Sequence, residues 1–147
     1  MFEMNVPYDK GEMKISLPEK NLAGVLEGKQ SEYTTELSEE ELVEQSLDNP
    51  IGSKSLEELA TGKKDIVIIS SDHTRPVPSK IITPILLRRI RSVSPDARIR
   101  ILVATGFHRP STHEELVDKY GEEIVANEEI VMHISTDDAS MKKIGVL

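Results

Sequence analysis

Cysteine and tryptophan are absent from the 147 residues, and aromatic residues make up only 3% of them. Without cysteine the chain has neither a disulfide framework nor a thiolate nucleophile. The scarcity of rings excludes a stacking platform for single-stranded nucleic acid and predicts an aliphatic core. No run approaches the roughly 18 apolar residues of a membrane span, and the acidic start does not resemble a signal peptide. These absences predict a cytoplasmic protein without nucleic-acid or membrane partners.

Three common active-site motifs are also missing. The chain has no G-x-x-x-x-G-K-[ST] loop, no G-x-G-x-x-G turn and no H-E-x-x-H helix, which argues against a P-loop NTPase, a standard dinucleotide domain and a zinc peptidase. His108 and His113 are not spaced as ligands of a closed zinc site, so no metal ligand is assigned. We expect His113 in the first turn of a helix and His133 as a partly buried strand residue.

Negative charge dominates the chain, with a formal net charge of −8, yet residues 63–110 are basic, with 10 lysines and arginines against 3 acidic residues. A local positive field in an acidic protein suits a small anion better than a polyanion, which requires a wide basic face. Five of the arginines are expected instead to pair with acidic helices: Arg88, Arg89, Arg91, Arg98 and Arg100.

A strand–helix–strand unit is predicted in the middle of the chain. Strand 65–70 contains the apolar run Ile66–Ile69 and has no polar alternation, which is typical of a strand covered on both faces in a parallel sheet. The following helix begins either after Ser79 or with Thr83 as its cap and Pro84 in its first position, and we favour the second start. Strand 97–104 comes next.

The expected fold class is therefore α/β. We predict a three-layer Rossmann-like domain with a mainly parallel sheet, which includes a third strand at 130–134 and is incomplete at its C-terminus. Capping boxes at 38–41, 55–58 and 111–114 predict further helix starts. Residues 1–147 are expected to form one amino-terminal domain that carries a cofactor and substrate site.

Two polar loops should leave the predicted strands at the same edge of the sheet, where α/β proteins bind ligands. The first loop holds Asp72, His73 and Arg75, and the second holds His108 and Arg109. His108 is a candidate for proton transfer, and an arginine can hold a substrate carboxylate. A structural salt bridge between Asp72 and Arg75 would explain the first loop almost as well.

The two loops contain the motifs S-D-H-T-R-P-V-P-S at 71–79 and A-T-G-F-H-R-P at 104–110. Together they resemble the amino-terminal part of the lactate racemase family. The resemblance implies an isomerase, a racemase or epimerase that interconverts stereoisomers of a 2-hydroxy acid by hydride transfer to a nickel-pincer nucleotide. It also implies that His108 is one of two acid–base histidines and that Arg75 reaches the substrate, with Arg109 as a second substrate-binding candidate. Four residues match the loop that contacts the cofactor: Asp72, His73, Thr74 and Arg75.

Members of that family are much longer, and their cofactor-tethering lysine, nickel-binding histidine and second acid–base histidine would lie beyond Leu147. We therefore expect residues 1–147 alone to be inactive, to lack nickel and to self-associate through an unpaired sheet edge. Two alternatives stay open: a racemase or epimerase of another 2-hydroxy or sugar acid, and a non-catalytic anion-binding module of the same fold.

Overall fold

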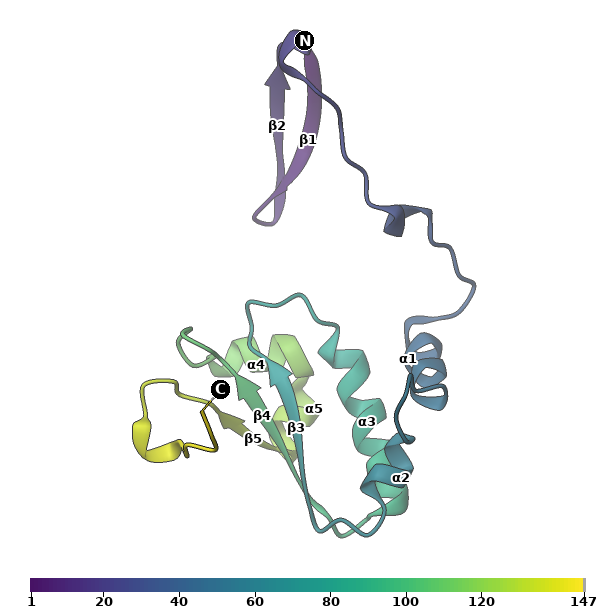
Figure 1. Cartoon of the computed structure of the whole chain (residues 1–147), viewed down its shortest axis with the longest axis vertical. Coiled ribbons are helices and arrows are strands. Elements are labelled where there is room, and N and C mark those ends of the chain that lie inside the picture. Colours follow the sequence, from purple (N-terminus) through teal and green to yellow (C-terminus); the bar gives the residue numbers. More distant parts are fainter. Residues whose placement is uncertain (147) are drawn as a thin grey trace. The chain divides into compact units, whose positions relative to one another are not determined.

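The computed structural model describes residues 1–146, apart from the side chain of Ser31 (Figure 1). The chain divides into two compact units, Met1–Glu36 and Leu37–Leu147, where the sequence predicted a single domain. No helix among the described residues is long and apolar enough to cross a membrane.

The first unit is built on an antiparallel hairpin of β1 (Phe2–Tyr8) and β2 (Gly11–Leu17). Two short 3-10 helices follow, η1 (Glu19–Asn21) and η2 (Lys29–Glu32). In β1 the partly buried Phe2, Met4 and Val6 alternate with more exposed residues, which is the pattern of a strand with one face packed. Asp9 takes a positive φ of 51° in the two-residue turn, a conformation that aspartate tolerates better than most residues.

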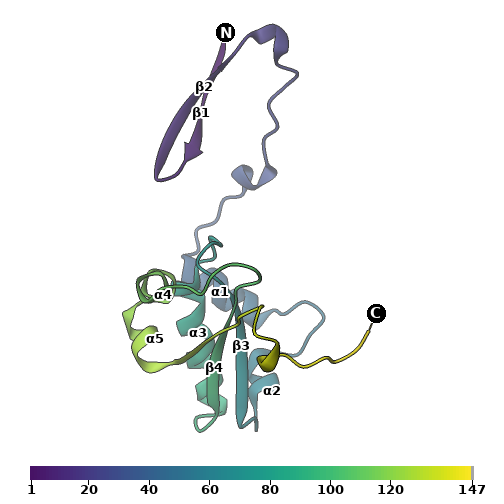
Figure 2. The same cartoon turned by 90° about the vertical axis from the view of Figure 1, so that its left-hand side faces the viewer.

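The second unit is the predicted α/β domain. Its sheet has the order β3-β4-β5, and both pairings are parallel. Figure 1 and Figure 2 both show β3 and β4 side by side. The elements of this unit are α1 (Glu39–Asp48), α2 (Leu56–Ala60), β3 (Asp65–Ser71), α3 (Ser79–Val93), β4 (Arg98–Ala104), α4 (His113–Tyr120), α5 (Glu122–Asn127), β5 (Glu129–Met132) and η3 (Asp138–Ser140).

Two of the three predicted capping boxes are confirmed, at the starts of α1 and α2. The third lies one residue later than predicted: Thr112, not Ser111, caps α4, and Glu115 completes the box. The hydroxyl of Ser111, which the sequence predicted as the cap, instead lies 2.9 Å from Nδ1 of His73. A contact with a distant part of the chain thus replaces the predicted local one.

The favoured start of α3 is wrong. The helix begins at Ser79, and Pro84 lies inside it. The carbonyl of Pro78 accepts hydrogen bonds from Ile81 and Ile82, which forms the first turn before the proline is reached. Pro84 removes the donor that would reach the carbonyl of Lys80, and Lys80 is exposed to water, which can replace that bond.

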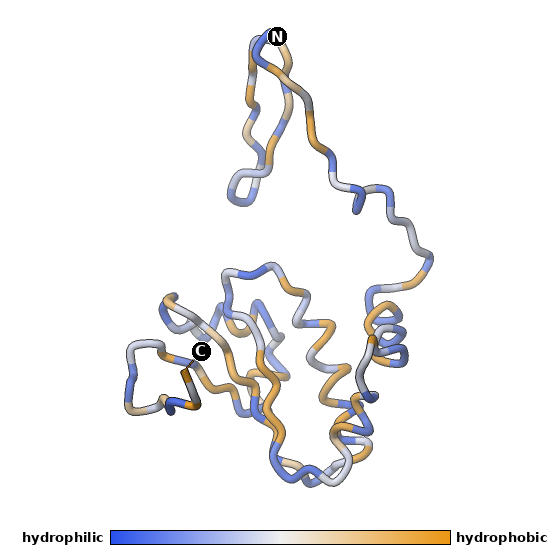
Figure 3. The backbone as a smooth tube through the Cα atoms, in the orientation of Figure 1, coloured by the Kyte–Doolittle hydropathy of each residue, from blue (hydrophilic) through white to orange (hydrophobic). Residues whose placement is uncertain are grey.

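The core lies between the helices and one face of the sheet. Isoleucines and valines of the strands, such as Ile101 and Val103, pack against Ile90 of α3 and Tyr120 of α4, so the core is largely aliphatic as predicted. The side chains of the opposite face, among them Ile69 at 73% exposure, remain accessible. Among the described residues the sheet has one helical layer. Figure 3 shows the hydrophobic residues concentrated along the strands, with polar residues in the loops at their ends.

The five arginines that were expected to be structural do pair with carboxylates. These ion pairs connect α3 to α1 and α2, connect α3 to the residue before β5, and connect β4 to its two neighbouring strands. The pairs are Arg88 with Glu44, Arg89 with Glu44, Asp48 and Glu57, Arg91 with Glu128, Arg98 with Glu129, and Arg100 with Asp65. Half of the ten basic residues of segment 63–110 are therefore paired with carboxylates of the fold, and the two loops contribute two further arginines, Arg75 and Arg109.

Candidate active site

The two polar loops leave adjacent parallel strands at the same edge of the sheet, as predicted. Ser71 at the end of β3 is in register with Ala104 at the end of β4. After β4 the chain turns back at once, through a turn closed by a 3.0 Å hydrogen bond from the amide of His108 to the carbonyl of Thr105. Gly106 adopts a φ of 57° inside this turn, a conformation that glycine reaches without strain. The turn brings His108 over the end of β3.

His108 pairs with Asp72 across the two loops. Its Nδ1 lies 2.6 Å from Oδ2 of Asp72. The other carboxylate oxygen of Asp72 accepts hydrogen bonds from the Thr74 hydroxyl at 2.7 Å and from the Thr74 amide at 3.0 Å. The salt bridge between Asp72 and Arg75 that the sequence left open is not among the ion pairs of the described residues.

Asp72 is held as a carboxylate. Only 2% of the residue is exposed. The Thr74 hydroxyl and then the His108 imidazole hold the pKa of Asp72 well below its ordinary value, against the opposing effect of burial. An ionised Asp72 accepts a hydrogen bond from Nδ1–H of His108, which leaves Nε2 as the proton acceptor of the ring. The His108 side chain is 48% exposed, so Nε2 is open to a ligand.

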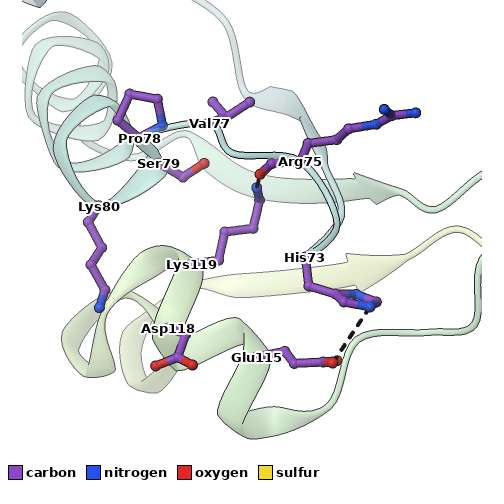
Figure 4. A pocket seen from close by; sticks show the side chains of 9 residues that line it. All are labelled: His73, Arg75, Val77, Pro78, Ser79, Lys80, Glu115, Asp118 and Lys119. Carbon is purple, nitrogen blue, oxygen red and sulfur yellow. Dashed lines mark hydrogen bonds and ion pairs between the residues drawn. The ribbon is translucent and has the colours of Figure 1, made fainter. Parts of the chain in front are cut away.

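Arg75 faces the same space. It lines a cavity of about 330 Å³ together with residues of both loops, including Asp72, Phe107 and His108. Its guanidinium makes no hydrogen bond or ion pair within the part of the chain that the structure describes, and Figure 4 shows it pointing away from its neighbours. A free fork of N–H donors next to a proton acceptor can orient a carboxylate for proton transfer.

Arg109 is engaged elsewhere. Its two terminal nitrogens donate to the carboxylate of Glu115 at 2.8 and 2.6 Å. Arg109 also does not line the cavity that Arg75 and His108 share. Its role as a second substrate-binding residue therefore stays a prediction, and it would require the ion pair with Glu115 to open.

His73 is engaged at both ring nitrogens. Nδ1 lies 2.9 Å from the Ser111 hydroxyl, and Nε2 lies 3.6 Å from a carboxylate oxygen of Glu115 (Figure 4). Arg109, followed by the Thr112 amide, lowers the pKa of Glu115 to about 2. Glu115 thus bridges the two loops as a carboxylate. The cofactor contact predicted for His73 is untested.

Lys119 was missed by the sequence reasoning. Its ammonium lies beneath the first loop, 3.2 Å from the Ser71 hydroxyl and 3.5 Å from the carbonyl of Arg75. Burial lowers the pKa of Lys119, while the charge of Asp72 opposes this effect. No sequence signal distinguished Lys119, because lysine is common on helix surfaces, and its burial follows only from the way α4 packs.

The described residues contain no cluster of three or more histidine, aspartate or glutamate side chains placed to hold a metal ion. The loops do provide one free guanidinium and several hydroxyl and amide groups at the edge of the sheet. This set of donors fits the organic, anionic part of a nucleotide cofactor and does not fit a metal.

The fold and the site define an α/β domain with a histidine–aspartate pair at the carboxyl edge of a parallel sheet, beside an arginine that has no partner among the described residues. The family described as "Lactate racemase N-terminal domain" matches residues 8–147. The chain therefore belongs to the lactate racemase family, as the two loop motifs predicted.

The similar proteins are much longer than this chain. The chain is 70% identical over 147 residues to a lactate racemase of Lactiplantibacillus plantarum and 47% identical to one of Thermoanaerobacterium thermosaccharolyticum. It is covered completely in both comparisons, and it spans 35% and 34% of the two relatives. The solved structure of the T. thermosaccharolyticum lactate racemase apoprotein matches with a TM-score of 0.83 and 45% identity, over 99% of this chain and 33% of that one.

Proposed function

We propose that this chain supplies the amino-terminal half-site of a lactate racemase, which interconverts the stereoisomers of a 2-hydroxy acid. The observation that carries the proposal is the pairing of His108 with the buried carboxylate of Asp72 at 2.6 Å. Racemisation requires a base that takes the hydroxyl proton while hydride leaves the adjacent carbon, and an acid that supplies a proton when hydride returns to the other face; His108 is one of the two acid–base histidines that the family implies. A histidine whose tautomer is fixed by a carboxylate suits both steps.

Each loop residue has a defined task in this proposal. Nε2 of His108 takes the proton from the substrate hydroxyl, and Asp72 stabilises the imidazolium that results. Arg75 binds the substrate carboxylate through two parallel N–H donors, which places the hydroxyl next to His108. Thr74 keeps Asp72 ionised and in place.

The nickel-pincer nucleotide implied by the family supplies the hydride acceptor when it is bound. In this chain residues 72–75 are the candidates to hold it: they match the family's cofactor loop, and Asp72 and Arg75 line the cavity. The relatives' printed name supports lactate as the substrate. A larger 2-hydroxy acid remains the alternative, since no residue of the cavity selects for a methyl group.

The test uses the full-length protein produced together with the enzymes that make the cofactor. We expect bound nickel and conversion of either pure lactate enantiomer into a mixture, measured by chiral chromatography. Conversion of another hydroxy acid, with lactate unchanged, would select the alternative substrate. A nickel-loaded protein that epimerises no member of a hydroxy-acid panel would contradict the proposal and favour a non-catalytic module. Residues 1–147 alone should show neither nickel nor racemisation.

A further inference from the structure

Helix α4 contacts the end of β3 and the first loop at three places. The Tyr120 hydroxyl donates a 2.8 Å hydrogen bond to the hydroxyl of Ser70. Near the start of the helix, a carboxylate oxygen of Glu115 lies 3.6 Å from Nε2 of His73. Lys119 makes the third contact from the same face as Glu115, because residues four apart on a helix are neighbours. The proposed proton transfer gives none of these three α4 residues a task.

Lys119 is the α4 residue that reaches the arginine of the site. Its ammonium lies 3.2 Å from the Ser71 hydroxyl and 3.5 Å from the carbonyl oxygen of Arg75. Figure 4 shows this side chain extending from α4 to the main chain of Arg75, whose guanidinium points away from it. Only 9% of Lys119 is exposed, so protein oxygens must replace much of the water that an ammonium needs. The positions of the ammonium and of the loop therefore depend on each other.

The direction of the Arg75 side chain is set by its main chain. The guanidinium has no hydrogen bond or ion pair with any described residue, so no partner fixes its position. The main chain is restrained, because the carbonyl of Arg75 accepts a 2.8 Å hydrogen bond from the Val77 amide and Pro76 restricts the backbone of the residue before it. Among the described residues, Lys119 is the one side chain that donates to this main chain. A change at Lys119 therefore reaches the guanidinium through the backbone.

We propose that Lys119 is a positioning residue of the site, whose ammonium holds the carbonyl of Arg75 and thereby directs the guanidinium into the cavity of His108. Lys119 does not line that cavity itself, so it acts through the loop and not on the substrate. The inference rests on the proposed binding of the substrate carboxylate by Arg75. It assigns α4 a role in substrate binding, although none of its residues touches the substrate.

The first test is kinetic and uses the full-length, cofactor-loaded enzyme. Lys119→Met nearly keeps the length of the side chain and removes its charge and donors. We expect KM for the hydroxy acid to rise by roughly tenfold, a typical result of losing a hydrogen bond to a charged group, while turnover at saturation and nickel content change less. Lys119→Arg keeps charge and donors and should recover part of the loss. The exposed Lys63→Met is the control and should match the parent.

A purely structural role would give a different result. Lys119→Met would then lower turnover and nickel content in step with melting temperature and leave KM unchanged, and this outcome would overturn the proposal.

A double-mutant cycle identifies the residue through which Lys119 acts. If Lys119 positions the two-pronged donor of Arg75, Lys119→Met should raise KM much less in an Arg75→Lys protein than in the parent, because the group that it positions is already lost. Independent, additive effects of the two changes on KM would show that Lys119 does not act through Arg75, and the assignment would be wrong.

Hydrogen exchange provides a test that does not depend on racemisation. In the full-length, cofactor-free protein, Lys119→Met should speed exchange of the first-loop amides several-fold, those of Val77 and Ser79 included, while the amides of β4 exchange as in the parent. If the methionine variant does not fold, Lys119→Gln, which keeps a donor and loses the charge, carries the same comparison. Parental exchange of the loop in the folded variant would refute the inference. A parent protein that racemises no hydroxy acid would contradict the proposed function and leave this measurement to decide the role of Lys119.

Discussion

The two loops at the edge of the sheet use the same residue types in opposite ways. His108, in the loop after β4, has one nitrogen fixed by a buried carboxylate and the other open to solvent. His73, in the loop after β3, has both nitrogens engaged, by Ser111 and Glu115. A ring with one free nitrogen can exchange a proton with a ligand, whereas a ring held at both positions braces the structure.

The arginines of the two loops show the same contrast in reverse. Arg75 lines the cavity of His108, and its guanidinium has no partner among the described residues, whereas Arg109, next to His108 in the sequence, pairs with Glu115. Each loop thus contributes one residue to the proposed chemistry and one to the connection between the loops. Residue type alone did not assign these roles, because they depend on which partner lies within reach.

The largest expected effect comes from removing the free imidazole. His108→Ala in the full-length enzyme should reduce turnover by roughly 10²–10⁴-fold, the usual contribution of positioned acid–base catalysis, with nickel content largely unchanged. His73→Ala should reduce turnover far less. Turnover, nickel content and melting temperature are measured on the same preparations, with the exposed His113→Ala as the control. If His108→Ala loses activity only in step with unfolding, the catalytic assignment fails.

Asp72→Asn tests whether turnover depends on the negative charge of Asp72 and not only on the shape of its side chain. The amide keeps the size of the carboxylate but cannot stabilise an imidazolium by charge, so turnover should fall by roughly 10²-fold. Circular dichroism and nickel analysis check that the loop and the cofactor content persist. An Asn variant that racemises at the parental rate would show that Asp72 only supports the loop.

Arg75→Lys keeps the charge and removes the two-pronged donor. We expect KM for the hydroxy acid to rise by roughly tenfold, the equivalent of about 1.4 kcal/mol, while turnover at saturation changes less. Arg109→Lys is the comparison: KM should stay near the parental value if Glu115 keeps that arginine occupied. An equal rise of KM in both variants would indicate that Arg109 also binds the substrate.

The smallest effect concerns the bridge between the loops. Because the pKa of Glu115 in the folded state is about 2, below its ordinary value of 4.5, its ion pair stabilises the fold above pH 4.5 and loses this effect as the pH falls toward 2. Glu115→Gln should therefore melt at a lower temperature than the parent at pH 7, and the gap should close at acidic pH. The exposed Glu122→Gln serves as the control. A gap that is independent of pH would assign the loss to packing.

Local sequence rules determined much of this chain. Apolar runs fixed β3 and β4, serine followed by glutamate three residues later fixed the starts of α1 and α2, and the two loop motifs identified the family. These features depend on neighbours within a few residues, which the sequence displays directly. The same rules failed at α4 and α3, where Ser111 bonds to His73 and the helix passes through Pro84.

Only the tertiary structure decided the partners of the charged side chains. Asp72 could have paired with Arg75, three residues away, but it pairs with His108, 36 residues away, because parallel strands bring the ends of β3 and β4 together. Lys119 became a buried ammonium because α4 packs beside the first loop. Long-range pairings follow from the register of the sheet and the packing of the helices, and neither is written in any single stretch of the chain.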